Sequence, residues 1–158
     1  MLKSVTTRPV TLADLPRISA LHARVFGPGR FARTAYRVRE GTPPVSRFCR
    51  IALEGERIVA SLRMTEVRIG GHPGALLLGP LAVDPDFAGQ GFGRRLIAEA
   101  IEDGRARGKD IIVLVGDEPY YGRLGFQRVP PGQIVFPGPV NPARILAIDL
   151  SEGAAAAA

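Results

Sequence analysis

Residues 75–116 constrain the fold of this chain more than any other stretch. Residues 75–83 are nearly all apolar, which is typical of a strand buried on both faces. A glycine-rich loop follows at residues 84–93, and residues 96–101 then repeat apolar side chains at helical spacing. A second apolar run at residues 110–116 completes a strand, loop, helix and strand. This order predicts two neighbouring parallel strands joined by a right-handed crossover.

The loop between the first strand and the helix has the composition of an anion site. It contains Gly89, Gly91 and Gly93 and leads directly into Arg94 and Arg95. Glycine lets a phosphate approach the backbone because no Cβ stands in the way. At a helix N-terminus the free N–H groups and the helix dipole both favour negative charge.

Two common phosphate motifs do not fit this loop. No Gly-Lys-Ser/Thr triplet is present, so it is not a P-loop. The dinucleotide fingerprint needs a further glycine at position 96, which is Leu96 here. Spacing alone leaves open that the glycines only form a tight turn. Arg94 and Arg95 favour the anion site, because two cations at a helix start oppose the dipole unless an anion binds there.

The same rules predict the remaining elements. Strands are expected at residues 5–10, 47–53, 58–69, 126–129 and 144–150, and helices at residues 15–26, 30–40 and 118–124. Pro16 fits only the first turn of a helix, so Asp14 is the expected N-cap of the first one. In the third strand the apolar residues change parity, which predicts a bulge or a twist near residues 65–66.

Composition places limits on the class of protein. The 158 residues suit one domain, which we expect at residues 1–150, with an alanine-rich, disordered tail at residues 151–158. No apolar run is long enough for a membrane span, the N-terminus lacks a secretory pattern, and Cys49 is a lone cysteine. We therefore expect a cytoplasmic protein with no membrane partner.

The net charge of +6 favours anionic ligands, and nucleic acid is one of them. The basic residues are scattered, however, without a run of five and without interleaved aromatic residues. We therefore expect no nucleic-acid partner. No cluster of histidine, cysteine and carboxylate residues has metal-ligand spacing, so no metal site is expected.

Three segments resemble the GNAT superfamily of N-acetyltransferases. They are Leu81-Ala82-Val83-Asp84-Pro85, the loop from Ala88 to Arg94, and Tyr120-Tyr121-Gly122-Arg123-Leu124-Gly125-Phe126. The resemblance implies an α/β (α+β) fold with a mixed, mostly antiparallel seven-stranded sheet. Its central fourth and fifth strands would be parallel, and about four helices would flank the sheet.

The resemblance also implies acetyl-CoA as co-substrate, bound where the fourth strand separates from the fifth. Gly79-Pro80 offers a physical reason for the separation, because proline cannot donate a ladder hydrogen bond. Backbone groups would bind the pantetheine at Leu81, Ala82 and Val83, and the pyrophosphate at Gly89, Gln90, Gly91, Gly93 and Arg94. Ala88 departs from the family's usual Gln or Arg, so that side-chain contact is missing, as is the family's Asn after the fifth strand.

For the chemistry, Tyr121 matches the family's tyrosine that faces the cofactor sulfur, and a backbone N–H near Val83 would polarise the thioester carbonyl. Glu66 is the expected general base, because a carboxylate interrupts an apolar parity there. Asp117, Glu118, His72 and a chain of water molecules are the alternatives for that role.

The expected function is transfer of an acetyl group from acetyl-CoA to a primary amine of a small molecule or a peptide. A CoA-binding regulatory module without turnover is the alternative, and retention of Tyr121 favours the enzyme. The acceptor amine does not follow from the sequence. The resemblance allows a homodimer, and the oligomeric state is open.

Overall fold

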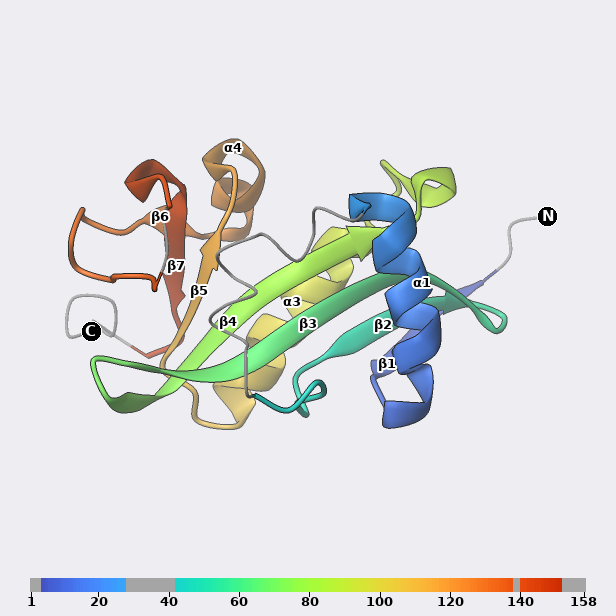
Figure 1. The fold of residues 1–158 in the computed structure, drawn as a ribbon, viewed down its shortest axis with the longest axis horizontal. Coiled ribbons are helices and arrows are strands. Elements are labelled where there is room, and N and C mark those ends of the chain that lie inside the picture. Colours follow the sequence, from blue (N-terminus) through green and yellow to red (C-terminus); the bar gives the residue numbers. More distant parts are fainter. Residues whose placement is uncertain (1–3, 28–41, 138–139, 152–158) are drawn as a thin grey trace.

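The computed structural model describes residues 4–27, 42–137 and 140–151, and shows one seven-stranded sheet with helices on both faces (Figure 1). The strands are β1 (Val5–Pro9), β2 (Arg50–Glu54), β3 (Arg57–Ile69), β4 (His72–Val83), β5 (Ile111–Val115), β6 (Gln127–Arg128) and β7 (Ile145–Asp149). The helices are α1 (Leu15–Phe26), α3 (Phe92–Ala106) and the short α4 (Glu118–Tyr121). The helix predicted at residues 30–40 lies outside the described residues.

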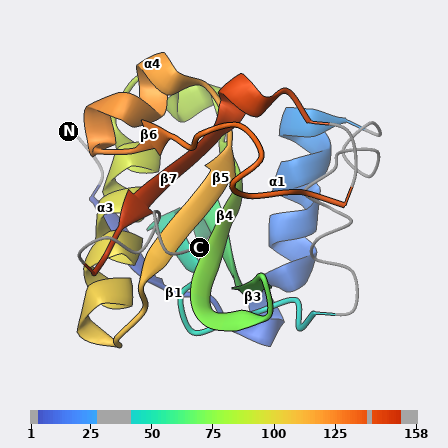
Figure 2. The same ribbon diagram turned by 90° about the vertical axis from the view of Figure 1, so that its left-hand side faces the viewer.

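The strand order is β1-β2-β3-β4-β5-β7-β6, and all neighbouring pairs are antiparallel except β4 and β5. The predicted mixed sheet with a central parallel pair is therefore confirmed. β7, the last strand in the sequence, lies between β5 and β6 in the sheet (Figure 2).

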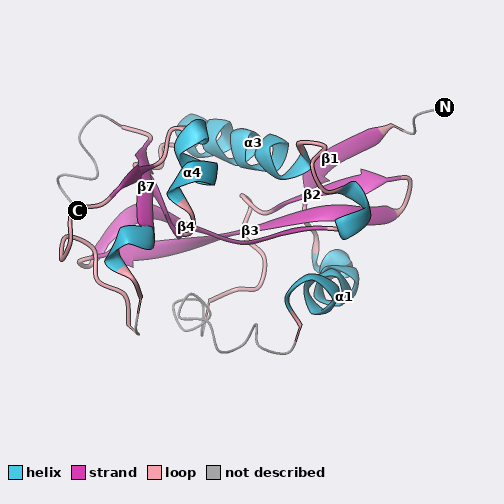
Figure 3. Cartoon of the chain, turned by 90° about the horizontal axis from the view of Figure 1, so that it is seen from above, coloured by secondary structure: helices cyan, strands magenta, loops and turns pink. Residues whose placement is uncertain are grey.

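The sheet separates two helical layers. Seen from above, α3 and α4 cover one face and α1 covers the other (Figure 3). On the first face Leu96 and Ile97 of α3 are fully buried against the sheet. On the second, Ile18 and Leu21 of α1 pack on a separate apolar cluster that includes Ile51 of β2. Three of the predicted helices are thus seen among the described residues.

The two halves of β4 differ in what they pair with. Residues 75–77 pair with residues 111–113 of β5, and no β5 partner is found for the described residues beyond Leu77. On the β3 side, Leu62 pairs with Leu81 and Met64 with Leu78, so β4 contains one extra residue there. The irregularity falls at Gly79-Pro80, as predicted, because the proline has no N–H to donate.

The register of β3 with β4 shifts on both sides of residues 65–66, between Leu62 and Met64 and between Val67 and Ile69. Residues 65–67 themselves pair with residues 75–77 of β4 without a break, so the predicted irregularity lies near these residues but not at them. The apolar parity changes because the two parts of β3 bury their side chains in different apolar clusters. Met64 packs in the cluster under α3, whereas Val67 packs in a different cluster, with the segment that follows β6.

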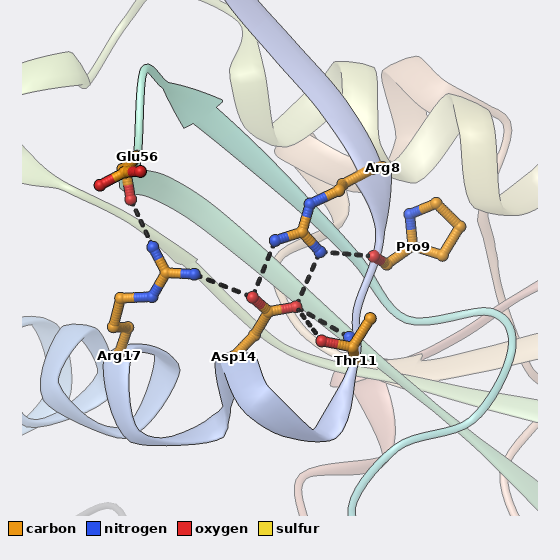
Figure 4. A network of polar contacts seen from close by, with 6 residues as sticks. All are labelled: Arg8, Pro9, Thr11, Asp14, Arg17 and Glu56. Atoms are coloured by element: carbon orange, nitrogen blue, oxygen red, sulfur yellow. Dashed lines mark hydrogen bonds and ion pairs between the residues drawn. The ribbon is translucent and has the colours of Figure 1, made fainter.

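Asp14 occupies the N-cap position of α1, and Pro16 lies in the first turn, as predicted. The Asp14 side chain, however, does not cap the helix. Its carboxylate instead accepts hydrogen bonds from Arg8, Arg17 and the Thr11 N–H at 2.7–2.9 Å (Figure 4). The start of α1 is thereby fixed to β1.

Candidate active site

The glycine loop lies between the end of β4 and the start of α3, and its glycines are needed for two different reasons. Gly89 and Gly91 have φ angles of +78° and +83°, which side chains disfavour, although a Cβ at either position would meet nothing within 4 Å. Gly93 is needed for space instead. A Cβ there would lie 3.0 Å from the hydroxyl oxygen of Tyr120 and 3.3 Å from the side chain of Leu81.

Several N–H groups of this loop have no protein acceptor. No backbone hydrogen bond is donated by Gly89, Gln90 or Gly91 to any residue in the described part of the chain. α3 begins at Phe92, and the first N–H groups of a helix have no carbonyl one turn earlier. No acidic side chain lies in the first turn of α3. The loop and helix start together form a cradle of free donors that fits an anion.

The two arginines at the start of α3 differ. Arg95 is engaged within the fold, because its Nη1 donates to the carbonyl of Val5 at 3.3 Å and its Nε lies 3.5 Å from Glu99. Arg94 is exposed and makes no ion pair or side-chain hydrogen bond with the residues described. Of the two arginines, Arg94 and not Arg95 is therefore the one expected to lie beside a bound anion.

The unpaired half of β4 ends beside this cradle. The N–H of Asp84 donates to Val59 of β3 at 2.8 Å. Backbone groups alternate in direction along a strand, so those of Ala82 also point toward β3, whereas those of Leu81 and Val83 point to the side where β5 is absent. The structure thus brings the backbone of Leu81 and Val83 next to the glycine loop.

The turn from β4 into the loop is fixed by Asp84, a residue that the sequence analysis did not single out. The carboxylate is buried and accepts hydrogen bonds from Arg24 of α1 at 2.9 Å, Arg57 of β3 at 2.8 Å and the N–H of Asp86 at 2.9 Å. The Arg57 guanidinium also lies 5.2 Å from the centre of the Phe87 ring. Burial alone would raise the pKa of Asp84, but these hydrogen bonds and charges outweigh it and lower the pKa below its usual range.

Tyr121 and Tyr120 lie on α4 and face different neighbours. Tyr121 packs against the end of β5, where a Cβ at Gly116 would fall 2.5 Å from its ring, and its ring meets Phe126 edge to face at 5.9 Å. Tyr120 reaches toward α3 instead, with its hydroxyl beside Gly93. Both tyrosines are partly buried, and their rings are 4.8 Å apart.

The structure does not bring Glu66 to the other predicted site residues. Glu66 pairs in register with Leu76, seven residues before Val83, which is about 23 Å along an extended strand. Its carboxylate is half exposed and lies 2.7 Å from Nζ of Lys109. His72 lies farther away still, at the first residue of β4.

Asp117 and Glu118 lie at the same end of the sheet as Tyr121, and both are exposed. Asp117 precedes α4 in the N-cap position, but its side chain does not cap the helix and lies 3.4 Å from Arg144. No group of three metal-ligating side chains is found among the described residues. Within the same residues, no helix is both long and apolar enough to cross a bilayer.

Comparison with known proteins places this geometry in a family. The acetyltransferase (GNAT) family profile matches residues 15–126. An uncharacterized N-acetyltransferase of Escherichia coli K12, YhbS, is 29% identical over 115 residues, which cover 72% of this chain and 68% of that protein.

Two solved structures are similar in fold. The crystal structure of YhbS from Escherichia coli in complex with CoA has a TM-score of 0.79 at 23% identity, covering 98% of this chain and 86% of that one. A GNAT family acetyltransferase from Brucella melitensis in complex with acetyl-CoA has a TM-score of 0.68 at 25% identity, covering 92% and 96%.

Proposed function

The chain belongs to the acetyltransferase (GNAT) family, and from this premise we propose that it transfers the acetyl group of acetyl-CoA to a primary amine of a small molecule or a peptide. We assign this activity to a single domain at residues 1–150. One observation carries the proposal: unpaired backbone groups of the end of β4 and of the glycine loop meet at one end of the sheet. The relatives crystallised with CoA and acetyl-CoA support it.

The described residues offer the hydrogen-bond groups and the positive charge that acetyl-CoA needs. A pantetheine chain has amides that need extended hydrogen-bond partners, and Leu81 and Val83 present such groups, while Ala82 keeps this segment in the sheet through its partner Ser61. The pyrophosphate needs N–H donors and positive potential. We assign this role to the backbone of Gly89, Gln90, Gly91, Gly93 and Arg94.

Acetyl-CoA supplies an activated acetyl thioester, and two groups of this chain would act on it. The N–H of Val83 points to the open side of β4 and is the donor we assign to the carbonyl oxygen. Tyr121 is the hydrogen-bond donor we assign to the sulfur. A phenol has an ordinary pKa near 10 and a thiol near 8.5, so complete proton transfer would cost roughly 2 kcal/mol and a hydrogen bond is the better description.

Deprotonation of the attacking ammonium needs a base near Tyr121. Glu66, the base predicted from sequence, is paired with Lys109 at a distance from that end of the sheet. Among the other predicted acids, Asp117 pairs with Arg144. We therefore propose that Glu118 or a chain of water molecules takes this proton. A variant of Glu66 tests whether that residue has any part in the reaction.

The test combines cofactor binding with turnover. The purified chain is titrated with acetyl-CoA by calorimetry and then assayed for release of free thiol with a panel of primary amines. Binding with amine-dependent thiol release is the expected result. Binding without thiol release for any amine would instead support the regulatory module.

Two loop variants test the cofactor site itself. Gly91→Val is expected to abolish binding, because φ of +83° disfavours a branched side chain and the new Cβ stands where the anion approaches. Gln90→Ala is the matched control and is expected to bind normally, since only its backbone N–H is used. Normal acetyl-CoA binding by Gly91→Val would refute the site.

A further inference from the structure

Tyr120 has a position that the chemistry assigned to Tyr121 does not explain. α4 and α3 lie on the same face of the sheet (Figures 2 and 3). The Tyr120 side chain reaches from α4 to the start of α3. Its hydroxyl oxygen lies 3.0 Å from the position that a Cβ of Gly93 would take. The side chains of Leu81 and Val83 lie 3.3 and 3.4 Å from the same position.

This contact puts the hydroxyl beside the first turn of α3. In an α-helix each Cα–Cβ bond tilts toward the N-terminus. The Tyr120 oxygen, close to the Cβ side of Gly93, therefore lies against the first turn of α3, on the side that faces Leu81 and Val83 of β4. The N–H groups of that turn point toward the N-terminal end of the helix and have no carbonyl one turn earlier.

The hydroxyl has no partner of its own. Within the part of the chain that the structure describes, the Tyr120 oxygen makes no hydrogen bond, whereas its backbone N–H donates to Asp117. The ring packs in the apolar cluster under α3, and phenylalanine would serve that purpose equally well. The oxygen is not among the fully buried side-chain atoms that lack a partner, so it remains open to a ligand. Packing of the ring alone does not account for a tyrosine here.

We propose that the Tyr120 hydroxyl donates a hydrogen bond to a pyrophosphate oxygen of acetyl-CoA, beside the N–H groups of Gly93 and Arg94. This inference rests on the proposed function and deepens its cofactor site. Burial raises the pKa of Tyr120, with Arg94 acting in the opposite direction, so the phenol keeps its proton and remains a donor. The adjacent tyrosines then serve opposite ends of one cofactor, Tyr120 the phosphates and Tyr121 the sulfur.

The test compares Tyr120→Phe with Tyr121→Phe. Tyr120→Phe is expected to weaken binding of CoA and of ADP, which retains the pyrophosphate, by roughly tenfold, as for a hydrogen bond to a charged group. It should raise KM for acetyl-CoA and leave kcat unchanged. With S-acetylpantetheine, which lacks the pyrophosphate, kcat/KM should equal that of the wild type. Tyr121→Phe should show the reverse, a lower kcat with CoA affinity unchanged.

Three outcomes would overturn the inference. Unchanged or tighter CoA binding by Tyr120→Phe would show that the hydroxyl does not donate to the cofactor. An equal loss with S-acetylpantetheine would place the contact away from the pyrophosphate. A lower Tm of the ligand-free variant with normal affinity would assign the hydroxyl to the fold. If the wild-type chain itself bound no CoA, the proposed function would fail, which separates that failure from this one.

Discussion

Asp14 and Asp84 are two buried carboxylates built in the same way but used for different purposes. Each is at most 2% exposed and contacts two arginines and one backbone N–H. Asp14 lies at the start of α1, and Asp84 contacts Arg24 in the last turn of the same helix. The helix is therefore tied to the sheet at both ends by the same type of interaction.

The partners of the two carboxylates differ in their distance along the chain. Asp14 binds Arg8 and Arg17, which are six and three residues away. Asp84 binds Arg24 and Arg57, which are 60 and 27 residues away. The Asp14 contacts join α1 to β1 only, while the Asp84 contacts fix the turn that leads into the glycine loop. We infer that the first network serves stability alone and the second serves stability and cofactor binding.

The largest effect on stability is expected for Asp14→Asn. The variant leaves two arginines and the Thr11 N–H short of their acceptor, and breaking a buried ion pair in this way costs about 3 kcal/mol, the low end of the range because the arginines are half exposed. Urea denaturation measures the free energy of unfolding. The affinity for acetyl-CoA should be unchanged, and a loss of affinity would contradict the division between the two networks.

Asp84→Asn is the matched variant at the other end of α1. It loses fewer hydrogen bonds than Asp14→Asn, so the expected loss of stability is about 2 kcal/mol, as for buried hydrogen-bond groups left without a partner. Because the carboxylate also orders the turn before the glycine loop, acetyl-CoA should bind about tenfold more weakly, which corresponds to about 1.4 kcal/mol. Calorimetric titration at a temperature where the variant is fully folded measures this. Wild-type affinity would show that the loop keeps its shape without Asp84.

Acid should weaken both networks in the same direction. Hydrogen bonds from Arg8 lower the pKa of Asp14 far below its usual value, and the pKa of Asp84 is lowered as well. A lowered folded-state pKa gives stability that is complete above the ordinary carboxyl pKa near 4 and is lost as the pH falls below it. Between pH 4 and 3 the loss of the Asp14 charge should therefore cost the wild type about 1 kcal/mol, and Asp84 should act in the same direction. Asp14→Asn should show a shallower decline in urea denaturation over this interval, and an equal slope would contradict the role of Asp14.

The smallest effect is expected for Glu66→Gln, which removes an exposed carboxylate from its cation. Glu66 and Lys109 form a surface pair, and such pairs contribute about 0.5 kcal/mol or less. The free energy of unfolding should therefore change little, and kcat should stay at the wild-type value across the pH range. A large drop in kcat would restore Glu66 as the general base.

The sequence predicted those parts of the fold that depend on near neighbours. The strand, glycine loop, helix and strand of residues 75–116, the cap position of Asp14 and the break at Gly79-Pro80 all follow from local rules, and the structure confirms them. The parity change in β3 did not locate the register shifts correctly, because the apolar cluster around Val67 is completed by distant segments.

The candidate site was predictable only in its backbone. Glycine spacing locates the loop, but it says nothing of Arg24 and Arg57, which reach Asp84 from two other elements. The orientation of neighbouring tyrosines on a four-residue helix is also set by packing, so the contact of Tyr120 with Gly93 could not be predicted from the sequence. A buried aspartate directly after an apolar strand was the one available hint.

The early end of the β4–β5 pairing has a consequence for solubility. Unpaired strand edges invite pairing with other chains and promote aggregation, so proteins usually shorten or cover them. Here the unpaired stretch lies in the interior of the sheet, on β4, and residues 75–77 of the same strand are paired with β5. A foreign β-strand, with side chains on both faces, would have to enter from one end only. A pantetheine chain is thinner than a β-strand and meets no such obstacle. The unpaired end of β4 can therefore admit the proposed cofactor while it disfavours pairing with a strand of another chain.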